Sequence, residues 1–266
     1  MAPRRQRHQE GNRVPEHPPT ETSRRRDLAL LAVAIVIALI IITVLVVRQH
    51  ASDTSASAAG TSTATSAAVG APAAAPLGPL GDLARRQPND PMAQGSVTAP
   101  VTFIEFADFR CPFCAQFTRT TEPQLVDKYV NSGVLRIEWR DMPIFGEQSM
   151  AAARAGRAAA AQGRFWPFVN AVYQAAPPKG HPDLTPAALR EFAQQAGVPD
   201  LARFTADAAS NTYDAAINAD LQVANRFGIS STPAFSVHGT PVLGAQPPEV
   251  FFTLIDNLAA GRPASS

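Results

Sequence analysis

The longest apolar segment of the chain, Leu28 to Val47, places the strongest constraint on how this sequence can fold. Its twenty residues carry no charge, and Thr43 is the one polar side chain among them. At a rise of ~1.5 Å per residue, a helix of this length spans ~30 Å, the thickness of a bilayer's hydrocarbon core. Buried helices of soluble proteins are usually shorter and flanked by turn residues. The segment therefore predicts a transmembrane helix over residues 28–47.

Basic residues around this segment predict its orientation. Seven arginines precede it, whereas Arg48 is the only Lys or Arg between it and Arg85. The positive-inside rule then places residues 1–27 in the cytoplasm, as a basic tail, and the rest of the chain outside. A cleavable signal peptide is the alternative, with small residues after His50 as a cleavage site. Its apolar core would normally be shorter, ~7–15 residues, so we favour an uncleaved signal anchor.

Residues 48–89 are rich in Ala, Ser, Thr, Gly and Pro, and we expect them to form a disordered linker. A folded domain is predicted over 90–262. The formal net charge of +1 conceals an uneven distribution, because residues 1–50 carry eight arginines against four acids. Residues 90–260 carry twelve basic against sixteen acidic residues, and this mildly acidic body excludes nucleic acid as a partner on charge.

The domain alternates between strand and helix patterns. An apolar, β-branched run, Val101–Ala107, predicts a buried strand, and a helix with a break at Pro123 follows from Pro112 to about Val130. A second strand, a helical block over about 147–227, two short strands and a final helix complete the order, with expected strands at Val134–Trp139, Pro233–Val237 and Pro241–Leu243. This order predicts an α/β fold whose mixed sheet has helices on both faces and a helical insertion.

Both cysteines of the chain lie in one motif, Cys111-Pro112-Phe113-Cys114, between the first strand and the first helix. At a helix N-terminus the free N–H groups and the macrodipole lower the pKa of the first thiol, while Pro112 fits the first turn. The second cysteine is more covered and suited to resolving a mixed disulfide. Half of a zinc site, an inert disulfide or a pair of buried free thiols are the alternatives. A zinc site lacks matching ligands, since the domain's histidines, His181 and His238, lie far apart in sequence, and we predict neither metal nor cofactor. We interpret His181 as a solvated loop residue and His238 as a solvated turn residue.

Glu105 lies within the first apolar strand, six residues before Cys111. Burial would raise the pKa of its carboxyl group and prepare it to accept the proton of the second cysteine. The alternative is that strand alternation turns Glu105 towards solvent.

Two segments together resemble the DsbA-type thiol–disulfide oxidoreductases of the thioredoxin superfamily, specifically the membrane-anchored bacterial kind. They are residues 99–114, which contain Glu105 and the CPFC motif, and residues 228–235, which contain Thr232-Pro233. The resemblance implies a thioredoxin-like core, a redox-active Cys111–Cys114 disulfide, and a buried proton acceptor at Glu105. It also implies a cis peptide bond before Pro233 and contact between the Thr232 backbone and substrate.

The same resemblance implies that the domain donates its disulfide to exported proteins outside the bacterial cell membrane, and that a quinone-linked membrane partner reoxidises it. Two residues depart from the strongly oxidising members. Phe113 replaces a histidine that stabilises the thiolate, so we expect a less depressed Cys111 pKa. Thr232 resembles the isomerase branch, which leaves a reductase or isomerase as the alternative. A tethered chaperone or binding module without redox activity is the second alternative.

Overall fold

A five-stranded mixed sheet organises residues 75–264, the part of the chain that the structure, a computed structural model, describes. The strand order is β1-β3-β2-β4-β5, in which β2 (Val101–Ala107) pairs parallel to β3 (Leu135–Asp141) and antiparallel to β4 (Ala234–Val237). β1 (Ala93–Gln94) and β5 (Thr240–Leu243) form the two edges. Every residue of β2 is buried, which explains its nearly continuous apolar sequence.

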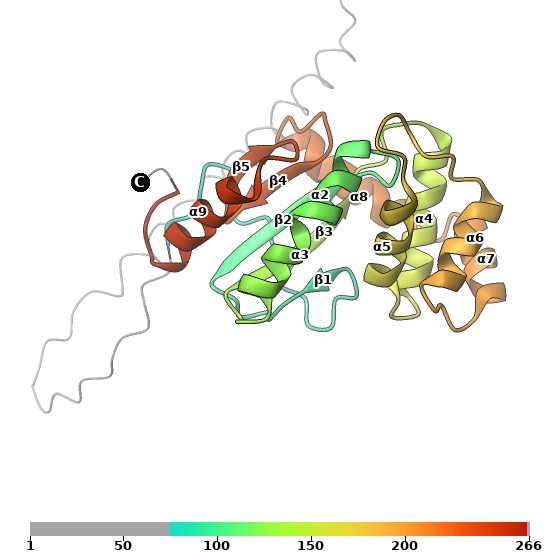
Figure 1. The fold of residues 1–266 in the computed structure, drawn as a ribbon, viewed down its shortest axis with the longest axis horizontal. Helices are drawn as coiled ribbons and strands as arrows, with labels where there is room; N and C mark the ends of the chain where they lie inside the picture. Colours follow the sequence, from blue (N-terminus) through green and yellow to red (C-terminus); the bar gives the residue numbers. More distant parts are fainter. Residues whose placement is uncertain (1–74, 265–266) are drawn as a thin grey trace, which may run out of the picture. The chain divides into compact units, whose positions relative to one another are not determined.

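Helices cover both faces of this sheet, as the sequence predicts (Figure 1). On one face, α2 (Pro112–Thr120), α3 (Glu122–Leu125) and α9 (Pro248–Ala259) pack through an aromatic cluster of Phe103, Phe117, Phe235 and Phe251. The predicted break near Pro123 is present: α2 ends at Thr120, and a π-helical turn, Val126–Val130, follows α3. The other face packs Ile104 and Phe106 against Ala224 of α8 (Asp214–Arg226).

The helical insertion gathers beside the sheet (Figure 1). It comprises α4 (Glu147–Ala160), α5 (Phe165–Ala175), α6 (Pro186–Gln195) and α7 (Leu201–Ala209), all of which lie within the helical block predicted over about 147–227. Phe165 and Phe168 are buried against Phe109, whereas Trp166 is partly buried. Because Phe109 lies two residues before Cys111, the insertion packs directly against the segment that carries the cysteine motif.

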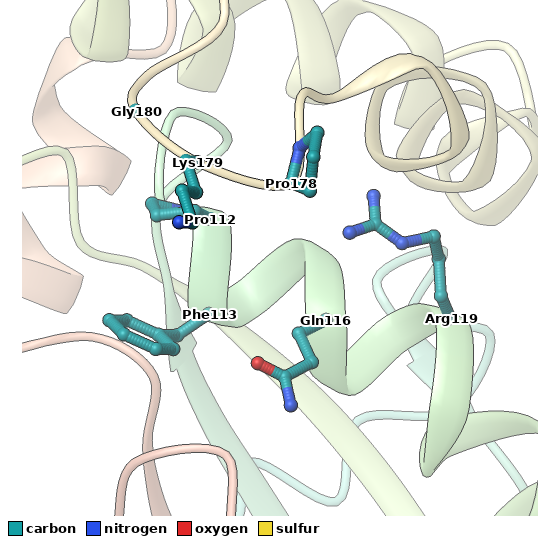
Figure 2. Close-up of a pocket in the computed structure, with 7 residues that line it drawn as sticks. All are labelled: Pro112, Phe113, Gln116, Arg119, Pro178, Lys179 and Gly180. Atoms are coloured by element: carbon teal, nitrogen blue, oxygen red, sulfur yellow. The ribbon is translucent and has the colours of Figure 1, made fainter.

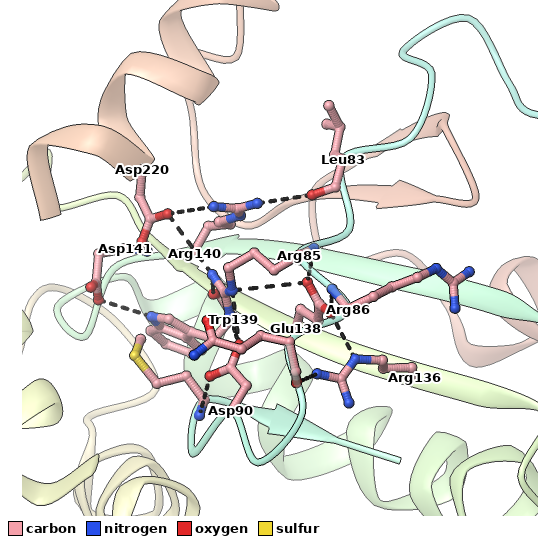
Figure 3. A network of polar contacts seen from close by, with 12 residues as sticks. Leu83, Arg85, Arg86, Asp90, Arg136, Glu138, Trp139, Arg140, Asp141 and Asp220 are labelled. Atoms are coloured by element: carbon pink, nitrogen blue, oxygen red, sulfur yellow. Dashed lines mark hydrogen bonds and ion pairs between the residues drawn. The ribbon is translucent and has the colours of Figure 1, made fainter. Parts of the chain in front are cut away.

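Residues 75–89 belong to the folded domain, which therefore begins before the expected boundary at Asp90. The amide of Gly78 donates to the His238 carbonyl at 2.9 Å, and the amides of Arg85 and Arg86 donate to the carboxylate of Glu138 at 2.7 and 2.9 Å (Figure 3). Glu138 is fully buried and also accepts from Arg136 Nε at 2.7 Å. Composition did not reveal this segment because its attachment depends largely on backbone amides and on the side chains of Arg85 and Arg86, with only small apolar contributions such as Ala75 and Leu83.

One expectation about a histidine is wrong, one short strand was not expected, and the N-terminal expectations fall outside the described residues. His238, which we expected to be solvated, is buried, and its Nε2 lies 3.0 Å from the Ala75 carbonyl oxygen. The short strand β1 was not predicted. The basic tail, the proposed membrane helix at 28–47 and residues 48–74 lie outside the described residues. Between residues 75 and 264, the helices are too short or too polar to cross a membrane.

Replacing Glu138 with Ala should destabilise the domain by about 3–5 kcal/mol, because it leaves buried Arg136 and two backbone amides without their acceptor. Arg203→Ala is the control, since Arg203 forms an exposed pair with Asp207 at 3.4 Å and should cost at most about 1 kcal/mol. Urea unfolding gives the free energy of unfolding of both variants. Equal, small losses of this free energy would show that the hydrogen bonds of Glu138 contribute little to stability.

Candidate redox site

Asp108 shapes the turn that carries Cys111 to the start of α2. Its carboxylate accepts from the amides of Arg110 at 2.8 Å and Ile144 at 2.7 Å, while its carbonyl accepts from the Cys111 amide at 2.9 Å. Tyr173 of α5 donates its hydroxyl to the same carbonyl at 2.9 Å. Cys111 is thereby fixed at the N-cap of α2, with Pro112 in the first turn. The N-terminal amides of the helix point towards the Cys111 sulfur, the arrangement that stabilises a thiolate.

Thr232 and Pro233 lie against the cysteine pair, although more than one hundred residues separate them in sequence. The thiol of Cys111 donates to the Thr232 carbonyl oxygen at 3.2 Å, a contact between residues 121 apart. The Thr232–Pro233 peptide bond is cis, as the resemblance implied. The structure therefore brings together the two segments that the sequence analysis selected.

The two thiols differ strongly in acidity. The pKa of Cys111 is lowered to about 6, chiefly by a hydrogen bond from the Cys114 thiol and against the opposing effect of burial. The Thr232 side chain and the amides of Phe113 and Cys114 contribute smaller shifts in the same direction. Burial raises the pKa of Cys114 well above its usual range, and the hydrogen bond to Cys111 acts in the same direction. At neutral pH Cys111 is therefore the thiol that ionises, whereas Cys114 keeps its proton.

Glu105 is fully buried between β3 and β4, so strand alternation does not expose it. Both of its carboxylate oxygens lack a hydrogen-bond partner among the described residues. Burial raises the pKa of Glu105 well above its usual range, and the charges of Glu122 and Cys111 raise it further. The charge of Glu105 in turn raises the pKa of Cys114, so the two groups lie close enough to influence each other. The site thus places the buried thiol of Cys114 near the carboxyl group of Glu105, which can accept a proton from that thiol.

Exposed apolar side chains surround the cysteine pair. Phe113 is 59% exposed and lies between two hollows. The first, about 530 Å³, separates the outer face of α2 from the loop at Pro178 to Gly180 (Figure 2). The second, about 490 Å³, is lined by Cys111 and Thr232, together with Ile144, Phe145 and His181. An extended polypeptide segment could therefore approach Cys111 along an apolar surface.

Sequence reasoning missed several of these surrounding residues. Ile144 and Phe145 follow β3, and no motif marked them; their position depends on the Asp108 carboxylate. His181 was interpreted as a solvated loop residue. It is indeed exposed, but its ring lies 4.3 Å from that of Phe145 and its Nδ1 lies 2.8 Å from the Arg110 carbonyl oxygen. Asp108 itself had a usable signal, as an acidic residue placed between a buried strand and the cysteine motif.

A mixed sheet with a CxxC motif at a helix start and a cis proline beside it defines a thioredoxin-fold redox protein. Comparison with known families agrees, because the family model Thioredoxin_4, described as thioredoxin, matches residues 87–257. The chain belongs to this family. The inserted helices between β3 and β4 give it the DsbA-like form of the fold.

Known relatives cover this chain to different extents. A Na(+)/H(+) antiporter NhaA 3 of Salinispora tropica is 34% identical over 155 residues, which are 57% of this chain but only 22% of the antiporter. A probable disulfide bond formation protein D of Bacillus anthracis is 28% identical over 149 residues, 54% of this chain and 68% of that protein. The crystal structure of oxidised BdbD from Bacillus subtilis superposes with a TM-score of 0.61 at 20% identity, covering 65% and 94% of the two chains.

The thiol of Cys111 should react with an alkylating agent at a rate that is half-maximal near its pKa of about 6. Cys114→Ala should move this midpoint upward, because it removes the hydrogen bond that lowers the pKa most. Alkylation rates of the reduced protein across pH, followed by mass spectrometry, measure both values. An unchanged midpoint in Cys114→Ala would contradict the assigned hydrogen bond.

Glu105→Gln should stabilise the domain increasingly as the pH rises. In the wild type the folded state keeps Glu105 protonated above the usual value of 4.5, whereas the unfolded chain ionises there. The wild-type domain therefore loses free energy of unfolding as the pH rises above 4.5. Glutamine does not titrate, so the variant does not lose stability in this way. Unfolding free energies of both proteins measure the effect, with Glu191→Gln as the exposed control. A difference that does not change with pH would contradict a raised Glu105 pKa.

Proposed function

We propose that this protein is an extracytoplasmic thiol–disulfide oxidoreductase that donates its Cys111–Cys114 disulfide to exported proteins. The lowered pKa of Cys111 carries this proposal. A stabilised thiolate favours the reduced form of the pair, and this preference makes the disulfide oxidising. The pKa of about 6 lies between those of thioredoxin, ~7, and DsbA, ~3.5.

The reaction begins when a client thiolate attacks the Cys111 sulfur of the oxidised pair. A bond forms between the client sulfur and Cys111, the Cys111–Cys114 bond breaks, and Cys114 leaves as a thiolate that takes a proton from Glu105. A second client thiolate then attacks the client sulfur of this mixed disulfide. Cys111 leaves as the stabilised thiolate, and the client gains a disulfide. In the reverse direction Glu105 accepts the proton of Cys114.

The Thr232 carbonyl supports client binding in this scheme. It lies 3.2 Å from the Cys111 sulfur and next to the hollow that contains Phe145, so it can accept a backbone hydrogen bond from a client strand. Phe113 and Ile144 supply apolar contact on either side. The backbone hydrogen bond does not depend on the client's side-chain sequence, a property suited to an enzyme with several clients.

A membrane location and a reoxidising partner complete the proposal. The apolar segment at 28–47 and the arginines before it support a single-pass anchor with the redox domain outside. The name of the Bacillus anthracis relative supports a role in disulfide formation. A quinone-linked membrane protein would restore the disulfide after each cycle by accepting two electrons from the reduced pair.

The reduction potential of the Cys111–Cys114 pair tests the oxidase direction. We expect a value between those of thioredoxin, ~−270 mV, and DsbA, ~−120 mV, because the Cys111 pKa lies between theirs. Equilibration of the soluble domain with glutathione buffers gives this potential. A value near or below that of thioredoxin would favour a reductase, and preferential action on scrambled over reduced substrate would favour an isomerase.

A further inference from the structure

A row of polar side chains runs along the buried side of α2 and α3. Cys114, Thr118 and Glu122 follow one another at intervals of four residues, so they lie on one side of the helix. All three are buried, with Glu122 only 5% exposed. An apolar side chain would be expected at each of these positions in a helix that covers a sheet, and the catalytic scheme above uses only Cys114.

Glu122 lies where this row meets a cavity. Its carboxylate accepts a hydrogen bond from Gln94 Nε2 of β1 at 3.0 Å. Glu122 and Thr118 both line a cavity of about 290 Å³, together with Gln94, Asp127, Trp166 and Asn170. A cavity of this size, lined by polar groups, has room for several waters. The buried Trp166 Nε1 has no hydrogen-bond partner among the described residues.

Glu105 points into the same layer between the sheet and α2. Phe103, two residues earlier and on the same side of β2, stacks against Phe117 of α2 at 5.9 Å between ring centroids. Gln94, the partner of Glu122, pairs with Ile137 of β3, and Ile137 pairs with Phe103 of β2. Glu105 and Glu122 therefore occupy neighbouring places in one buried layer. When Cys111 is covered by a client, the cysteine side of this layer is closed to solvent.

We propose that Glu122 relays protons between Glu105 and the water of this cavity, on the far side of α2 from the client. The proposal rests on the proposed function. When Cys114 leaves as a thiolate and takes the Glu105 proton, Glu122 supplies a proton to the Glu105 carboxylate, and a cavity water then reprotonates Glu122. The reverse sequence carries the Cys114 proton outward. Glu122 acts through Glu105 and touches neither client nor cysteine.

The electrostatics of the layer suit this role. Burial raises the pKa of Glu122 to about 7, against the opposing effect of the hydrogen bond from Gln94, so the group exchanges protons readily at neutral pH. The titratable groups close to it are Glu105 of β2 and Asp127 at the cavity rim. A negative charge on Glu122 raises the pKa of Glu105. Loss of the Glu122 proton therefore favours protonation of Glu105, which is the direction that the relay requires.

The test uses the reaction of the oxidised protein with dithiothreitol, followed by stopped flow across neutral pH. Glu122→Gln preserves the shape of the side chain but not its titration. It should slow the reaction about tenfold, which is a part of the ~10²–10⁴-fold contribution of general acid–base catalysis. It should also remove the bend near pH 7 in the plot of rate constant against pH. Glu122→Asp should restore the bend. Glu191→Gln, an exposed substitution, should match the wild type.

Carbon-13 NMR of the Glu105 carboxyl group provides a readout that does not depend on activity. Glu122→Gln should lower the Glu105 pKa, because a neighbouring negative charge is lost. If the wild type fails to react with dithiothreitol, the proposed function is wrong. If it reacts and Glu122→Gln shows the same rates, the same bend and the same Glu105 titration, the relay is wrong.

Discussion

The charge that forms on the Cys111 sulfur is the constraint on which the rest of the site depends. A thiolate in a buried position is costly unless hydrogen-bond donors surround it. Here the thiol of Cys114 and the amides at the start of α2 supply them, which lowers the Cys111 pKa to about 6. Burial raises the pKa of Cys114, and the same hydrogen bond raises it further. Complete burial of one thiol and the hydrogen bond between the two thus separate the roles of two chemically identical side chains.

The helical insertion holds this arrangement in place from the side. Tyr173 of α5 donates to the Asp108 carbonyl, and Phe165 and Phe168 pack around Phe109. Phe109 also presses closely on α4, because a Cβ added at Gly156 would lie 2.8 Å from its ring. The insertion and the turn before Cys111 therefore form one packed unit. Its loops also supply Ile144, Phe145 and His181 to the hollow beside Cys111.

Much of this fold could be predicted from local sequence. β2 is a buried apolar run, and Pro186 and Pro248 mark helix starts by their fixed backbone angle. The cysteine motif and Thr232-Pro233 were recognised as one site because their joint pattern resembles a known family. Attachments over long sequence distances could not be predicted. The binding of residues 75–89 through Glu138, and the place of Glu122 beside Glu105, depend on pairings that no periodicity reveals.

Trapping of clients tests the central claim, that Cys111 exchanges disulfides with other proteins and Cys114 resolves the product. A Cys114→Ala variant of the full chain, expressed in its native host and captured after acid quenching, should carry client proteins in reducible linkage. Mass spectrometry should place every linkage at Cys111. A Cys111→Ala variant should carry none, since Cys114, unlike Cys111, does not line the hollow beside Thr232. Absence of any mixed disulfide on Cys114→Ala would contradict the account.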